Sequence, residues 1–299
     1  MLVNQQVLQS IYTNFRVIYN KAFENAKPLY TKIATVIPSS TAKESYKWLG
    51  KVPRMKEWIS DRVIQNLSAY DYEIKNKDFE VTVSVDRNDI EDDSIGVYRP
   101  IIQEMGNSAA MHPDELVFPL LINGFTNKCY DKKAFFADDH KEGKSGSQSN
   151  KSTYKLTLET YGDARASMMS FKDDRGKPLK VTPNLLVVPP QLESQARRIL
   201  YSEQIEGTTN IYKGSAELLI APELSINPTA WFLLDVSRPV RPTIFQQRKK
   251  PKFVSMTKES DTNVFMNKKY IYGADSRDNA GYGLWQLAFG STGEEDKPL

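Results

Sequence analysis

Two stretches of the chain carry hydrophobic residues at helical spacing, and the first lies at the N-terminus. In residues 7–25 the apolar positions fall on one stripe, formed by Leu8, Ile11, Phe15, Ile18 and Phe23. This spacing predicts an amphipathic helix. The segment has no nearby helical partner in the sequence, so its apolar face must return to a distant core or dock on another chain.

The second helical stretch spans residues 86–127 and is interrupted. The run "DRNDIEDD" predicts a short acidic helix, after which Ser94 and Gly96 break the pattern. An i, i+4 stripe follows at Val97, Ile101, Met105 and Ala109. Pro113 either kinks this helix or starts a second one, and Pro119 is a further irregularity. We interpret this long helix as the spine of the molecule.

Period-two alternation and short apolar runs predict strands between and after these helices. Phe79, Val81, Val83 and Val85 alternate clearly, "TKIATVIPSS" indicates a strand ending at Pro38, and Leu185–Val188 reads as a buried strand. A helix opened by a proline pair should follow that buried strand, and another helix is expected over 154–172. The alternating Trp285, Leu287 and Phe289 predict a final strand, with a loose tail behind it. Short strands are also expected in 210–265, so the fold class is α+β.

One stretch, "SYKWLGKVPRMKEW" at 45–58, combines aromatic and basic side chains with residues that break regular structure. Gly50 and Pro53 lie between the six residues of interest: Tyr46, Trp48, Lys51, Arg54, Lys56 and Trp58. Such a mixture seldom builds a core. The aromatic faces must therefore cover nucleic acid, a ligand or another protein.

Composition narrows the class of protein. The chain has 299 residues, 40% of them hydrophobic and 26% charged, which indicates a packed globular core in one large domain or two ordinary ones. Its 40 basic and 37 acidic residues are too evenly matched for a dedicated nucleic-acid binder. One cysteine excludes a disulfide framework and a cysteine-rich metal site, and favours a reducing compartment. We find no apolar run long enough for a signal peptide or a membrane span, so we expect a soluble protein made inside the cell.

The loop-like stretch 138–153 contains the first candidate chemistry. "DDHKEGKS" resembles the end of a phosphate-binding loop, but Asp138 replaces the first glycine and no apolar strand leads into it. Asp138, Asp139 and His140 could be metal ligands, yet three adjacent residues need partners elsewhere to converge on one ion. An exposed polar loop is the simpler interpretation.

Other candidates are equally weak. The carboxylates of "DRNDIEDD" lack the glycine of a calcium loop, because Glu91 stands in its place, and helix-start charges explain them more simply. His112 is outside any HExxH pattern, Cys129 has no adjacent base, and "GYGLWQ" lacks the third glycine of a dinucleotide fingerprint. We therefore predict no catalytic residue, no cofactor and no metal site, and a protein that is not an enzyme.

The most basic run is "RPVRPTIFQQRKKPK" at 238–252. It could form a nucleic-acid patch, because phosphate contacts need only lysine and arginine on one face. The near-even overall charge favours a solvated or intersubunit loop instead.

Several longer strings resemble a known family. "SSTAKESYKWLGKVPRMKEW", "NKDFEVTVSVDRNDIEDDSIGVYRPIIQEMGNSAAMHPDELVF", "LLINGFTNKCYDKKAFFADDH" and "TPNLLVVPPQLESQARRIL" are similar to the major head subunit of Mu-like phages, the gpT family. The likeness is dense from about 30 to 140 and collinear to about 290. It implies a major capsid protein with the Hong Kong 97-like fold.

The resemblance also implies a division of the chain. Residues 1–37 would be an N-terminal arm, and 38–82 an extended loop with its base strands. Residues 83–183 and 266–299 would form a peripheral domain with the spine helix, and 184–265 an axial domain. Copies would build the hexamers and pentamers of an icosahedral or prolate shell around double-stranded DNA, in a virion whose subunits are made in the bacterial cytoplasm.

In that arrangement the stretch 45–58 lies in the extended loop and packs on a neighbouring subunit. Trp48 and Trp58 would be its anchors, and the basic residues between them would meet acidic groups across the boundary. Further partners would be a portal, a decoration protein and nonspecifically bound DNA, but no membrane. Because the chain begins almost directly at the arm, we expect the scaffold and the maturation protease to be separate proteins.

Two alternatives stay open. Another phage structural or nucleic-acid-binding protein, such as a tail-tube component, would show one basic face and aromatic residues packed within its own chain. An enzyme would need a deep pocket that holds His112 or His140 together with carboxylates.

Overall fold

Two β-sheets organise the chain in the computed structural model, which describes residues 4–50, 71–92, 94–205 and 207–298. A four-stranded sheet has the order β1-β11-β12-β4, and a five-stranded sheet has the order β5-β13-β10-β6-β9. The strands of the first are β1 (Ala34–Pro38), β11 (Thr243–Met256), β12 (Lys269–Tyr282) and β4 (Lys77–Asp86). Those of the second are β5 (Lys151–Tyr154), β13 (Ala288–Glu295), β10 (Trp231–Leu234), β6 (Leu185–Val188) and β9 (Glu217–Ile220). The α+β class is confirmed.

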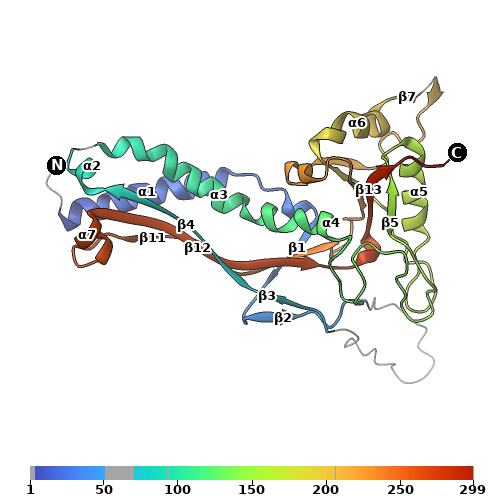
Figure 1. Ribbon diagram of the computed structural model, residues 1–299, viewed down its shortest axis with the longest axis horizontal. Helices are drawn as coiled ribbons and strands as arrows, with labels where there is room; N and C mark the ends of the chain where they lie inside the picture. Colours follow the sequence, from blue (N-terminus) through green and yellow to red (C-terminus); the bar gives the residue numbers. More distant parts are fainter. Residues whose placement is uncertain (1–3, 51–70, 93, 206, 299) are drawn as a thin grey trace.

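The four-stranded sheet forms an elongated body with two long helices, α1 (Gln5–Asn25) and α3 (Arg99–Val117), along one face (Figure 1). The predicted N-terminal helix is confirmed. Asn4 caps it by accepting a 2.9 Å hydrogen bond from the backbone N–H of Val7. The buried residues of α1 are Leu8, Ile11, Phe15 and Tyr19. Its apolar stripe therefore returns to a core shared with α3 and the sheet, even though those elements are distant in the sequence.

The predicted stripe on the spine helix is wrong in part. Val97 and Ile101 are 67% and 48% exposed, and Ile102 is buried in their place. Met105 is buried as expected. Val97 lies in η2, before α3 begins, so the predicted stripe crosses two elements. The buried face of α3 also includes Gly106, which packs closely on α1 and which a hydrophobic pattern cannot mark because it has no side chain.

Of the two roles predicted for Pro113, the start of a second helix is wrong, because Pro113 lies inside α3. The second helix, α4 (Pro119–Asn123), starts at Pro119. The acidic helix before the spine is α2 (Arg87–Glu91), capped by Asp86, and the 3-10 helix η2 (Ser94–Tyr98) fills the predicted interruption. Buried Asp114 of α3 binds the end of the N-terminal segment, since its carboxylate accepts the backbone N–H of Leu29 and Tyr30 at 2.8 and 2.7 Å.

The five-stranded sheet lies at the other end of the molecule, with its own helices around it (Figure 1). Its central strands β6 and β10 are buried at every position. The predicted strand at 185–188 and the helix after the proline pair are confirmed. The helices here are α5 (Leu158–Met169), η3 (Pro190–Leu192), α6 (Glu193–Tyr201) and η4 (Pro222–Ile226). A small hairpin of β7 (Gln204–Ile205) and β8 (Thr208–Thr209) follows α6.

The C-terminal prediction needs two corrections. Trp285–Leu287 is a 3-10 helix, η5, and the last strand begins only at Ala288. The tail is held in place, because Lys297 donates to Glu159 at 2.5 Å and to Asp163 at 2.7 Å. These two carboxylates on α5 supply a partner that the tail's own sequence does not reveal.

The sheets divide the chain differently from the ranges expected for the peripheral and axial domains. Strand β11, inside the range 184–265, pairs with β1 and β12 in the elongated body. Strands β5 and β13, outside that range, belong to the five-stranded sheet. The short helix α7 (Thr262–Asn267) joins β11 to β12 at the far end of the body. In the described part of the chain, no helix has the length and apolar character needed to span a bilayer.

Candidate intersubunit surface

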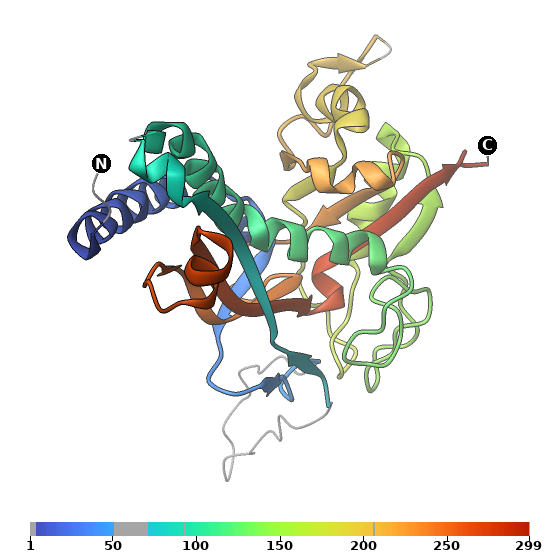
Figure 2. The same ribbon diagram turned by 60° about the vertical axis from the view of Figure 1, so that its left-hand side comes forward.

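A short hairpin projects from the elongated body and leads into the stretch that carries the predicted contact residues. Strand β2 (Lys43–Ser45) pairs antiparallel with β3 (Glu73–Lys75), and β4 follows directly after Asn76. Figure 2 shows this hairpin leaving the sheet on the side away from α3. Lys51, Arg54, Lys56 and Trp58 lie outside the described residues.

One buried amide fixes the base of the hairpin. Gln246 of β11 accepts a hydrogen bond from the Tyr46 hydroxyl at 2.8 Å. The same side chain donates to the Ile74 carbonyl at 3.1 Å and to Asn76 Oδ1 at 2.7 Å. Asn76 in turn donates to Ser39 Oγ and to the Thr41 carbonyl. Both strands of the hairpin are thus bound to the sheet through polar groups that are satisfied in the dry interior.

The two aromatic residues of the stretch that the structure describes, Tyr46 and Trp48, differ in their exposure to solvent. Tyr46 is 3% exposed, and burial raises the pKa of its hydroxyl. Trp48 is half-buried and meets Tyr46 edge to face, with 6.3 Å between ring centroids. Tyr46 is therefore a core residue of its own chain, whereas Trp48 keeps part of its surface free. Contact of the six residues with a neighbouring subunit stays a prediction.

The turn before β2 is held by a single carboxylate. Glu44 accepts hydrogen bonds from the backbone N–H of Ser40 and Thr41 and from the hydroxyls of Ser39 and Thr41, at 2.9 to 3.1 Å. These donors, with the Ser40 N–H first, lower the pKa of Glu44 to about 2. The carboxylate thus stays charged and ordered at any physiological pH.

Exposed apolar side chains gather at both ends of the molecule. At the end of the elongated body, Val254 and Met256 of β11 and Phe265 and Met266 of α7 are exposed, and we call these four residues the tip patch. Phe265 is 80% exposed. At the opposite end, Tyr201 and Ile211 are exposed beside α6 and the β7–β8 hairpin. Large exposed apolar groups of this kind often mark surfaces that partner proteins cover.

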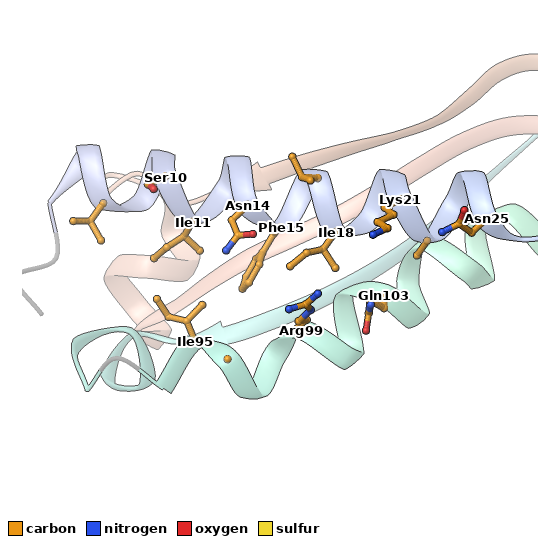
Figure 3. A pocket seen from close by; sticks show the side chains of 14 residues that line it. Ser10, Ile11, Asn14, Phe15, Ile18, Lys21, Asn25, Ile95, Arg99 and Gln103 are labelled. Carbon is orange, nitrogen blue, oxygen red and sulfur yellow. The ribbon is translucent and has the colours of Figure 1, made fainter.

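A groove of about 710 Å³ runs between α1 and the η2–α3 segment. Its floor is apolar, with Ile11, Phe15 and Ile18 from α1, whereas Arg99 and Gln103 of α3 border it on the other side (Figure 3). The groove follows α1 from Val7 to Asn25 but only the first turns of α3, so it offers a long and mixed surface rather than a closed ligand pocket.

The basic run 238–252 is not a loop, since most of it forms the long strand β11. Several of its cations bind their own chain. Arg238 donates to the Leu179 carbonyl at 2.6 Å, Arg241 donates to the Lys32 carbonyl, and Lys249 pairs with Asp275. These internal bonds occupy three cations of the run, whereas Arg248, Lys250 and Lys252 are exposed on β11.

The stretch expected to be an exposed loop is exposed at many positions but also holds a buried polar cluster. His140, Glu142, Ser145 and Asn150 are all buried. Asn150 donates to the Phe135 carbonyl at 2.8 Å and accepts from the Ala137 backbone N–H at 2.9 Å. The polar composition suggested exposure at these positions. In the structure these side chains are buried because they hydrogen-bond to the backbone of neighbouring loops, where no strand supplies partners.

Sequence reasoning placed His140 with the wrong carboxylates. Asp138 and Asp139 are exposed, and Asp139 pairs with Lys133. His140 Nδ1 lies 2.6 Å from Asp131 Oδ2, and the Cys129 thiol donates to Asp131 Oδ1 at 3.2 Å. Burial raises the pKa of Cys129 well above its ordinary value, which argues against a nucleophilic thiolate.

A second buried carboxylate lies beside this group. Glu142 accepts from Tyr130, Trp285 and Gln286, the last at 2.8 Å. Burial raises the pKa of Glu142 to about 7. Neither Asp131 nor Glu142 was singled out from the sequence, because their partners come from loops and from η5, far along the chain.

The remaining candidates have structural roles. Asp86 caps α2, Asp89 accepts from the Tyr98 hydroxyl, and Glu91 pairs with Arg87, which supports the interpretation as helix-start charges. His112 Nε2 lies 3.2 Å from Asp278 and connects α3 to β12.

Comparison with known proteins places the chain in a family. The model of the Mu-like prophage major head subunit gpT family matches residues 8–154, 148–224 and 225–297. The major capsid protein of Escherichia phage Mu is 36% identical over 98% of this chain and 76% of its own length. The Mu-like prophage FluMu major head subunit of Haemophilus influenzae is 32% identical over 98% of this chain and 75% of its own length.

Solved structures give the same result. A chain of the bacteriophage JBD30 procapsid has a TM-score of 0.62 and 36% identity, covering 99% of this chain and 77% of that chain. A virus-like particle from Pyrococcus furiosus has a TM-score of 0.53 at 8% identity over 93% of this chain and 98% of that chain, which shows a shared fold alone. With the family model matched from residue 8 to residue 297, the chain belongs to the Mu-like prophage major head subunit gpT family.

Proposed function

We propose that this head subunit closes a phage shell by repeated self-association, in the Hong Kong 97-like arrangement of hexamers and pentamers around double-stranded DNA. Its family membership and its likeness to capsid chains of JBD30 support the shell role. The observation that carries the proposal is the projecting β2–β3 hairpin with its buried, hydrogen-bonded base. A rigid base is useful where the segment it carries must reach a defined place on a neighbour.

In this arrangement the stretch 45–58 contacts the next subunit. Trp48 has free surface for such a contact, and Trp58 would be the second anchor. Lys51, Arg54 and Lys56 would meet acidic groups there. We propose the ranges 1–37, 38–82, 83–183 with 266–299, and 184–265 as arm, extended loop, peripheral domain and axial domain. Strand β11 then extends from the axial range into the elongated body, and β5 and β13 of the peripheral range complete the five-stranded sheet.

The wider set of partners belongs to the same proposal. A shell of this kind needs a scaffold and a maturation protease, a portal, and an inner surface that tolerates DNA. A decoration protein would add to the outside. Many small repeated contacts make such a shell stable because the number of contacts per particle is large.

The direct test is Trp58→Ala, expressed together with the other head proteins of the same phage. We expect soluble subunit with an unchanged melting temperature but a strong loss of sedimenting particles. Lys75→Ala, an exposed change on β3 outside the stretch, is the control and should assemble normally. If Trp58→Ala forms particles as efficiently as the parent, the proposed contact is wrong.

A further inference from the structure

Two loops between α4 and β5 bring three different metal-binding side chains together. In the first loop the Cys129 backbone N–H donates to the Lys133 carbonyl at 2.8 Å, and Lys132 turns the chain with a φ of 67°. This turn places Cys129 and Asp131 side by side, with 3.2 Å between the thiol sulfur and Asp131 Oδ1.

The second loop supplies the third group. His140 and Gln148 exchange backbone hydrogen bonds at 3.0 and 2.9 Å, which holds His140 at the start of a small bridge. The His140 ring stacks on Trp285 with 4.1 Å between centroids and 5° between planes. Its Nδ1 faces Asp131 and its Nε2 faces the Phe135 carbonyl, 3.3 Å away.

We propose that Cys129, Asp131 and His140 bind one Zn²⁺ ion, or a divalent ion of similar softness. Their ligand atoms all lie within 4.8 Å of one another. A thiolate, an imidazole and a carboxylate form a ligand set that suits zinc. Around a tetrahedral zinc ion such atoms stand roughly 3.3–3.6 Å apart. The 2.6 Å separation of His140 Nδ1 and Asp131 Oδ2 must therefore open by less than about 1 Å, whereas a pair at the 4.8 Å limit must close by a little more than that.

The surroundings of His140 match those of a metal ligand. A histidine that binds metal through one nitrogen usually donates its other N–H to a carbonyl or carboxylate. The Phe135 carbonyl has that position at Nε2, and Trp285 fixes the plane of the ring. Asp131 is held as well, because its Oδ1 accepts the backbone N–H of Lys133 at 3.0 Å.

Charge balance favours a divalent ion here. Binding displaces to solvent the thiol proton of Cys129 and the hydrogen that lies between His140 Nδ1 and Asp131 Oδ2, and it leaves an N–H on His140 Nε2 that faces the Phe135 carbonyl. One thiolate and one carboxylate then neutralise the two positive charges of the ion. A buried site with zero net charge avoids the cost of an unpaired buried charge.

Such an ion would join two loops that have little regular structure of their own. Cys129 and His140 are buried, and Trp285 belongs to η5 just before the last strand of the five-stranded sheet. Zinc would therefore stiffen the region between the elongated body and that sheet. This inference does not depend on shell assembly and can be tested on the soluble subunit.

The single cysteine makes the test specific. If Co²⁺ is titrated into the metal-free full chain, any thiolate-to-cobalt absorption band must come from Cys129, the chain's one cysteine. We expect such a band to saturate at one ion per chain and to be displaced by Zn²⁺. Zinc should also raise the melting temperature by several degrees.

Variants distinguish cobalt binding by all three proposed ligands from nonspecific binding by the Cys129 thiol alone. Cys129→Ser should lose the band. Asp131→Asn and His140→Gln should weaken metal affinity at least tenfold, because loss of a group that only hydrogen-bonds to a ligand already costs about 10–100-fold. Asp139→Asn and His112→Gln are the matched controls and should bind as the parent does. The proposal is overturned if the parent gives no band, or if His140→Gln and Asp131→Asn bind cobalt with parental affinity.

Discussion

Gln246 illustrates how a single buried side chain connects segments that are distant in the sequence. It joins the strand β11 to Tyr46, Ile74 and Asn76, so it ties the sheet to both strands of the projecting hairpin. No pattern in the sequence marks it, because one glutamine among the polar residues of 246–252 looks exposed. Its role depends on partners that the fold brings together.

Replacing this amide should cost more stability than removing one of its bonds. Tyr46→Phe removes one hydrogen bond and should reduce the free energy of unfolding by about 1 kcal/mol. Gln246→Leu leaves three buried polar groups without their partner, which should cost about 3 kcal/mol or more. Urea unfolding of both variants measures the difference. Equal losses would show that Gln246 does not connect the hairpin to the sheet.

Asp114 provides a prediction about pH. Burial, and then the nearby charge of Glu115, raise its pKa above 3.8, although the N–H groups of Leu29 and Tyr30 oppose this. A carboxyl with a raised pKa in the folded state binds its proton more tightly there than in the unfolded chain. Its contribution to stability is therefore fully present below pH 3.8 and is lost as the pH rises through the folded-state pKa.

The variant Asp114→Asn isolates this effect, because its amide oxygen can still accept both N–H groups. We expect the parent to lose stability relative to the variant as the pH rises from below 3.8 towards neutrality. Urea unfolding over that range gives the difference, and titrations elsewhere in the chain cancel from it. A constant difference, or one of opposite sign, would contradict the assignment.

Helices and strands were predictable where apolar residues alone set their faces. The helix over 7–25, the strand at 185–188 and the alternating strand around Val81–Val85 follow directly from periodicity. The spine helix was predicted but its buried face only in part, since Gly106 and Ala110 lie on that face beside Ile102 and Met105 and carry little hydrophobic signal. The buried polar cluster was missed because its side chains bond to loops, and loop partners leave no periodic signal.

The helix crossing gives a prediction at this scale. A Cβ added to Gly106 would lie 2.4 Å from the Tyr19 carbonyl oxygen and 3.0 Å from Ala22 Cβ. Gly106→Ala gains about 1 kcal/mol of helix propensity but forces α1 and α3 apart, at about 1–3 kcal/mol or more, so a net loss is expected.

Gly96→Ala is the matched control, because a Cβ there meets nothing within 4 Å. Thermal unfolding should therefore place Gly106→Ala several degrees below the parent and Gly96→Ala within a degree or two. If both variants melt together, the close approach of the two helices does not limit stability.

At the scale of the whole molecule, the elongated shape leaves apolar groups uncovered at both ends. The tip patch beside α7 and the residues Tyr201 and Ile211 near α6 lie far apart on the molecule. In a capsid protein such surfaces are available for contact with neighbouring subunits. Sequence patterns cannot locate these patches, since they reveal which residues are apolar but not which of them the chain itself covers.

The variant Phe265→Ser tests whether the tip patch forms a contact that particle assembly requires. Phe265→Ser should change the free energy of unfolding by no more than about 0.5 kcal/mol, because the side chain is exposed. We expect fewer particles by sedimentation, whereas the nearby exposed change Lys258→Ser should leave the yield unchanged. A normal particle yield from Phe265→Ser would exclude the patch from the contacts that limit assembly.

The central claim is that the stretch 45–58 is covered by a neighbouring subunit, and hydroxyl-radical footprinting tests it most directly. The isolated subunit and the assembled particle would be oxidised under the same conditions and compared by mass spectrometry. Trp231 and Trp285, which are buried in their own chain, serve as internal controls and should react little in either state. We predict that Trp48 and Trp58 react in the subunit and become protected in the particle. Equal reactivity of both residues in the two states would contradict the account.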